Sequence, residues 1–159
     1  MKQKIAAILF SILSAIAIIF GLMYCLRGHL MDYHIAYLGK TESELNAFSD
    51  RIVPLYLALM KIAGACMIAI GLSSLPIIFK PLKREESWAW LVLLVHFTAS
   101  LVFMFLVTHY IAGHIQKGDP RPPYILVLIM LGLLVIALAL SFPKSFRNYF
   151  ISLFKRKTN

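Results

Sequence analysis

Long apolar stretches separated by short polar segments make up most of the chain. Four of them reach or approach the roughly 20 residues that a helix needs to cross about 30 Å of hydrocarbon, namely residues 5–26, 52–79, 88–112 and 124–142. No segment alternates apolar and polar residues over enough positions to predict membrane β-strands. The pattern therefore predicts an all-α protein, a four-helix transmembrane bundle that forms a single integral membrane domain over residues 1–159.

Two polar segments predict helices outside the four spans. In the first long loop, Thr41 and Glu44 are spaced as a capping box, which predicts a short helix over residues 42–50 on the outer surface. At the C-terminus, residues 145–157 place aromatic and aliphatic side chains on one helical face and basic or polar ones largely opposite. This pattern predicts a basic amphipathic helix that lies in the membrane interface and binds anionic lipid headgroups.

Composition and charge agree with a membrane protein and assign its orientation. The chain is 60% hydrophobic and only 14% charged, whereas about a quarter of a soluble domain is charged. The formal charge of +9 comes from basic residues at span ends, where lipid headgroups and topology explain it, so we expect no nucleic-acid partner. Both termini and the loop between the second and third spans carry most of the Lys and Arg residues, which predicts that both termini are cytoplasmic.

Part of the chain resembles a known group of proteins. Residues 31–39 and 56–65, with the loop 80–85 and the pair Trp88-Ala89, resemble a group of small bacterial integral membrane proteins with four spans. The resemblance implies the same fold and a location in the bacterial inner membrane. It implies no activity, cofactor or catalytic residue.

Lys61 is the only Lys, Arg, Asp or Glu residue inside an expected span. A lysine near the middle of a bilayer costs roughly 2.5–3.5 kcal/mol on insertion scales. The small residues Ala58, Gly64, Ala65 and Ala69 share its helical face, and small residues at such spacing indicate close helix packing. We therefore expect Lys61 to face the bundle interior, at the floor of an outward-facing polar pocket. The alternative is a lysine that extends along the helix to the headgroups.

Several further residues are candidates for this pocket. They are tyrosines, one acid and two histidines: Tyr24, Tyr56, Tyr110, Asp32, His34 and His96. We expect tyrosine hydroxyls such as that of Tyr56 on the wall and Asp32 or His34 near the mouth. His96, inside the third span, fits either a hydrogen-bonded packing residue or a proton relay.

The outer-side histidines are candidate metal ligands. Together with Asp32, His34 and His109 contain the donor types that a metal site uses. The pairs His29/His34 and His109/His114 are each five residues apart, about 140° around a helix, so neither pair forms a ligand set alone. Ordinary interfacial histidines are the alternative interpretation.

The cysteines and the absence of cofactor motifs narrow the chemistry. Cys25 lies near the outer end of the first span and Cys66 about 20 Å into the second, too far apart for a disulfide. The sequence has no glycine-rich phosphate loop, nucleophile elbow or Cys-x-x-Cys motif. We expect no cofactor.

These features favour a non-enzymatic binding or accessory protein. Its partner would be a membrane lipid or small amphiphile that enters from the outer side, another membrane protein, or a second copy of the chain. One alternative is an enzyme that uses Asp32 and the outer histidines on a lipid-borne substrate. Another is a small dimeric carrier that uses Lys61 and His96.

Overall fold

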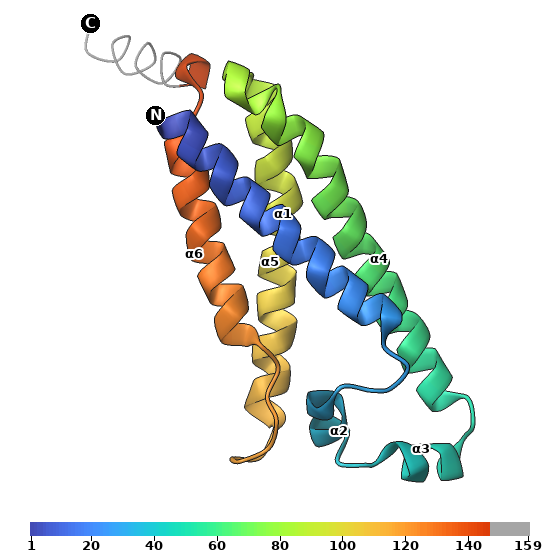
Figure 1. Ribbon diagram of the computed structural model, residues 1–159. Coiled ribbons are helices and arrows are strands. Elements are labelled where there is room, and N and C mark those ends of the chain that lie inside the picture. The colour runs from blue at the N-terminus through green and yellow to red at the C-terminus, as the bar shows by residue number, and fades with distance from the viewer. Residues whose placement is uncertain (147–159) are drawn as a thin grey trace, which may run out of the picture.

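The computed structural model describes residues 1–146, and all the regular elements of this part are helices (Figure 1). In chain order, the elements are α1 (Lys2–Leu26), α2 (Asp32–Leu38), α3 (Glu42–Phe48), α4 (Ile52–Phe79), the 3₁₀ helix η1 (Leu82–Arg84), α5 (Ser87–His114) and α6 (Tyr124–Leu140). Nearly all of the amphipathic tail predicted over residues 145–157 lies outside the described residues.

Three of the helices are long and apolar enough to span a membrane, as the sequence predicts. They are α1, α4 and α5, with 25, 28 and 28 residues. The fourth predicted span is also an apolar helix, but α6 has only 17 residues. At 1.5 Å per residue it is about 25 Å long, shorter than the other three.

The connections place the helix ends in two groups (Figure 1). The start of α1, the η1 turn and the end of α6 gather at one end of the molecule, which we call the η1 end. There, the Lys144 ammonium lies 3.0 Å from the Glu85 carboxylate. Helices α2 and α3 lie at the opposite end, the α2 end, together with the last turns of α1 and α5.

Glycines bring α1 and α4 into direct backbone contact, and this is the most extensive helix pair in the bundle. A Cβ atom added to Gly21 would lie 2.6 Å from the Gly64 carbonyl oxygen, and one added to Gly64 would lie 2.6 Å from the Gly21 oxygen. About two turns further along α4, a Cβ atom added to Gly71 would lie 2.6 Å from Ile18 Cγ1. Close approach of this kind between small residues is the usual basis of membrane helix association.

The main hydrophobic core lies toward the η1 end. There the first half of α1 packs against α5 and α6, with the rings of Phe10 and Phe97 5.9 Å apart. A second, smaller cluster lies at the α2 end, where Tyr33 of α2 is buried with Met60 of α4 and Ile115 after α5. The polar helices at the α2 end are thus fixed to the bundle by apolar side chains.

The predicted capping box begins α3. The Glu44 N–H donates to Thr41 Oγ1 at 3.3 Å, and the Thr41 N–H donates to the Glu44 carboxylate at 2.8 Å. The backbone N–H of Thr41 is the main reason that the pKa of Glu44 is lowered. The helix ends at Phe48, two residues before the predicted boundary. Helix α2 was not predicted; it ends at Leu38 and is capped by Gly39, whose φ of +63° suits glycine.

Candidate functional site

Lys61 does not face the bundle interior. Its side chain is exposed on α4, and Ala58, Ala65 and Ala69 on the same face are exposed with it. The glycine that contacts α1, Gly64, lies about 60° around the helix from Lys61, because successive residues turn by about 100°. The expectation of a pocket with Lys61 at its floor is therefore corrected: of the small residues expected on its face, Gly64 contacts α1, whereas the alanines are exposed.

The other residues predicted for that pocket are distributed over several places. The hydroxyls of Tyr24 and Tyr33 lie 2.5 Å apart and form a hydrogen bond between α1 and α2. Tyr110 lies near the end of α5, where its ring packs on His114 with centroids 4.3 Å apart. Tyr56 packs against the cluster at the α2 end.

His96 is far from these groups. It is half-buried, and its Nδ1 lies 3.5 Å from the Ser74 hydroxyl of α4. This contact agrees with the interpretation of His96 as a hydrogen-bonded packing residue, because it links α5 to α4 where few other contacts join these helices.

The histidines and Asp32 do not come together as metal ligands. His34 accepts a hydrogen bond on Nδ1 from the Met31 N–H at 3.4 Å, and burial lowers its pKa. His109 stacks on Phe105 within α5, with ring centroids 5.5 Å apart. In residues 1–146, no group of three or more His, Cys, Asp and Glu side chains is arranged to hold a metal ion. This corrects the expectation of a site made by Asp32, His34 and His109.

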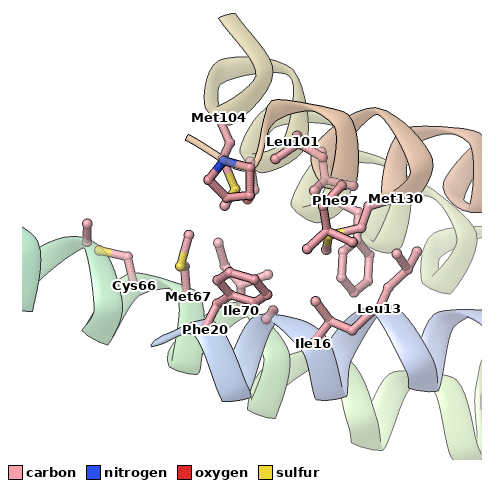
Figure 2. A pocket seen from close by; sticks show the side chains of 16 residues that line it. Leu13, Ile16, Phe20, Cys66, Met67, Ile70, Phe97, Leu101, Met104 and Met130 are labelled. Atoms are coloured by element: carbon pink, nitrogen blue, oxygen red, sulfur yellow. The ribbon is translucent and has the colours of Figure 1, made fainter. Parts of the chain in front are cut away.

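A cavity of about 260 Å³ lies between the α1–α4 pair and the α5–α6 pair (Figure 2). Its lining is almost entirely aliphatic, aromatic and sulfur-containing: Leu13, Ile16, Ala17, Phe20, Ala63, Cys66, Met67, Ile70, Phe97, Ser100, Leu101, Met104, Pro123, Leu126, Val127 and Met130. We call it the apolar cavity. Its position follows from the packing, because the glycines hold α4 tightly to α1 while α5 contacts α6 more extensively than it contacts α4.

A second pocket of about 250 Å³ adjoins the apolar cavity toward the α2 end. The two share Phe20 and Pro123 in their linings. The second pocket is also lined by Arg27 and Arg121, one just after α1 and the other just before α6, and we call it the basic pocket. Neither arginine forms an ion pair with a residue in the range 1–146.

Tyr24 and Tyr33 add hydroxyl groups to the basic pocket. Burial is the main cause that raises the pKa of Tyr33 far above its ordinary value, and the neighbouring Tyr24 raises it further. Tyr33 therefore stays neutral at physiological pH. The basic pocket thus combines two cationic guanidinium groups with neutral hydroxyls.

A third pocket, of about 540 Å³, continues from the basic pocket at the surface of the α2 end. The two share Asp32 and Pro120. The third pocket also contains Asp119, Tyr37 and His114, and we call it the acidic pocket. Three adjoining pockets, apolar, basic and acidic, therefore lie between the middle of the bundle and its surface at the α2 end.

Comparison of the chain with protein-family models, curated proteins and solved structures finds no significant match. The candidate site therefore depends on geometry. Sequence analysis named Tyr24 and Asp32 but did not find Arg27, Arg121 or Asp119. A usable signal was present: Arg27 directly follows the apolar run of α1, and Arg121 lies shortly before that of α6.

Proposed function

We propose that this chain is a four-span protein of the bacterial inner membrane that binds an anionic amphiphile. The hydrocarbon tail occupies the apolar cavity, and the anionic head lies in the basic pocket. The observation that carries the proposal is that these two spaces adjoin, because Phe20 and Pro123 line both of them. An anionic amphiphile fits such a site, because its tail needs an apolar surface and its head needs a cationic surface next to it.

The size of the apolar cavity limits the tail. Pockets for small molecules usually measure about 300–1,000 Å³, so a cavity of about 260 Å³ has room for no more than one hydrocarbon chain. Its surroundings supply such chains at high concentration, since α1, α4 and α5 are membrane-spanning in length and composition. A tail would exchange lipid contacts for protein contacts of similar polarity, so the head must supply most of the selectivity.

Charge supports the assignment of the head. Arg27 and Arg121 outnumber the single acid of the basic pocket, Asp32. A planar guanidinium presents paired N–H donors that match phosphate and carboxylate oxygens. Tyr24 and Tyr33 add neutral hydroxyls beside the same space.

The distribution of basic residues supports the orientation. Lys and Arg residues at the η1 end include Lys2, Lys4, Lys83, Arg84 and Lys144, and positive residues are enriched on the cytoplasmic side. We infer that the η1 end, with both termini, is cytoplasmic and that the amphiphile enters from the periplasmic side. A reporter domain fused after residue 159 should accordingly report a cytoplasmic location.

The alternatives from the sequence have less support. An enzyme that uses Asp32, His34 and His109 needs these groups together, and they are apart. A carrier that uses Lys61 and His96 needs both inside one path, and Lys61 is exposed. We therefore propose a protein that acts by binding, with no chemical step.

Binding can be tested with a lysophospholipid that has one 16-carbon chain and a phosphoglycerol head, added to the purified full-length chain in detergent micelles. Native mass spectrometry across a concentration series would measure saturation at one copy per chain. Ala63→Phe places a ring at the cavity wall and should weaken binding at least about tenfold. The matched control is Ala69→Phe, on the exposed face of the same helix, which should bind like the wild type.

The head is tested separately. Arg27→Gln with Arg121→Gln should weaken binding about tenfold or more, because two charge-assisted contacts are lost. Lys83→Gln with Arg84→Gln, at the η1 end, also removes two positive charges; it is the charge-matched control and should have no effect. Non-saturable binding, or equal affinity of Ala63→Phe and Ala69→Phe, would refute the proposal.

A further inference from the structure

The acidic pocket carries two carboxylates and adjoins the basic pocket, which carries the two arginines. Asp32 belongs to both the basic and the acidic pockets, and Asp119 to the acidic pocket. The recorded ion pairs among residues 1–146 join other groups: His29 to Glu42, Lys40 to Glu44 and Lys144 to Glu85. Two cationic and two anionic side chains thus line adjoining spaces without neutralising one another.

Groups in this arrangement suit a ligand with both charges. All four charged side chains are exposed, and opposite charges on a protein surface gain little by pairing directly in water. Here the guanidinium groups and the carboxylates line consecutive spaces. A ligand that carries an anionic group and, a few bonds away, a cationic group would place its anion near the guanidinium groups and its cation near the carboxylates.

Aromatic side chains surround the acidic pocket. Tyr37 lines it, and its ring lies 6.4 Å from that of Tyr110 and 6.3 Å from that of His114, centroid to centroid. A hydrogen bond with Tyr110 is the main reason that the pKa of Tyr37 is raised, so its ring stays neutral. Neutral aromatic faces attract a cation through the quadrupole of the ring.

We propose that the head of the bound amphiphile is zwitterionic, with a phosphate in the basic pocket and a primary ammonium in the acidic pocket. This inference rests on the proposed function. The ammonium donates N–H bonds to Asp32 and Asp119 and lies against Tyr37. Carboxylates favour a primary ammonium over a quaternary one, because only the primary group has N–H donors for them. The class of ligand is therefore a single-chain lipid with a phosphoethanolamine head.

The test compares three lysophospholipids with the same 16-carbon chain and with phosphoethanolamine, phosphocholine or phosphoglycerol heads. Each is titrated onto the purified full-length chain in micelles and measured by native mass spectrometry. The phosphoethanolamine lipid should bind at least about tenfold more tightly than the phosphoglycerol lipid, and more tightly than the phosphocholine lipid. Asp32→Asn with Asp119→Asn should remove this preference and strengthen phosphoglycerol binding, because Asp32 is also the acid of the basic pocket.

The control variant is Asp50→Asn, which removes an exposed acid at the same end of the molecule and should preserve the preference. Equal affinity for the three heads, with binding still weakened by Ala63→Phe, would overturn the zwitterion proposal and leave the amphiphile site intact. A phosphocholine lipid that binds as tightly as the phosphoethanolamine lipid would overturn the assignment of N–H donors. Failure of all three lipids to saturate would instead refute the proposed function itself.

Discussion

The contact between α1 and α4 makes a sharp prediction about Gly64. In Gly64→Ala, the new methyl carbon would lie 2.6 Å from the Gly21 carbonyl oxygen, 2.8 Å from Cys25 Sγ and 2.9 Å from Tyr24 Cβ. Ordinary contacts of a Cβ atom begin at 3.4 Å, so the two helices would have to separate by about 0.8 Å at this point. The nearest atom belongs to a backbone, which cannot rotate away as a side chain can.

The magnitude follows from two opposing terms. Overpacking a well-packed site costs typically 1–3 kcal/mol, whereas alanine favours a helix over glycine by up to about 1 kcal/mol. We expect Gly64→Ala to lower the free energy of unfolding by about 1–2 kcal/mol. Gly132 of α6 gives the matched control, because nothing lies within 4 Å of a Cβ built there. Gly132→Ala should be neutral or stabilising by up to about 1 kcal/mol.

Equilibrium unfolding in mixed micelles, with dodecyl sulfate as the denaturant and helix content followed by circular dichroism, would measure both variants. The order of stability should be Gly132→Ala at or above the wild type and Gly64→Ala below it. A Gly64→Ala protein as stable as the wild type would refute the direct backbone contact of α1 with α4. Equal losses of stability in both variants would also contradict the geometry, because a methyl group at Gly132 has no atom within 4 Å to clash with.

Three further predictions concern the α2 end. Tyr33→Phe removes the hydrogen bond to Tyr24 and should lower the free energy of unfolding by about 0.5–1.5 kcal/mol, measured by the same unfolding assay; no loss would contradict the 2.5 Å contact. Burial lowers the pKa of His34, so the docked state of α2 binds its proton less readily than the undocked state. Docking should be fully stable above the ordinary histidine pKa of about 6.5 and weaken as the pH falls below it. Amide exchange in α2, corrected for intrinsic rates, should therefore be faster at pH 5 than at pH 7.5. This pH difference should disappear in His34→Gln. Thr41→Ala removes the cap of α3 and should destabilise that helix by about 0.5–2 kcal/mol, seen as faster amide exchange in its first turn; unchanged exchange would contradict the capping role.

Sequence patterns predicted the helices well because their signals are local. Runs of apolar residues give α1, α4 and α5 as membrane-length helices, and the spacing of Thr41 and Glu44 gives the start of α3. Cys25 and Cys66 were predicted to lie at different depths, too far apart for a disulfide, and both are free. Each of these signals lies within one element and needs no knowledge of its neighbours.

Helix faces were harder to predict, because all faces of these helices are apolar. In α4 the small residues around Lys61 predicted one contact face, but of these only Gly64 contacts α1, and Gly71 extends that contact on a face without Lys61. Alanine fits equally well at a helix contact and against lipid. Glycine is informative here because its missing Cβ allows the backbones to meet. Which small residue forms the contact depends on the partner helix, and a single sequence does not show the partner.

The linked pockets depend on a difference in helix length that joins several parts of the sequence. Helix α5 has 28 residues and α6 has 17, so α5 extends about 16 Å further at 1.5 Å per residue. The segment from Ile115 to Pro123 has to cover this distance, and Figure 1 shows it running between the end of α5 and the start of α6. It includes Asp119, Arg121 and Pro123, which therefore line the acidic pocket, the basic pocket and the apolar cavity, in that order. A full-length sixth helix would place these residues beyond the end of the bundle. The short α6 thus brings charged groups of a loop to the opening of an apolar cavity, which is the arrangement that an amphiphile requires.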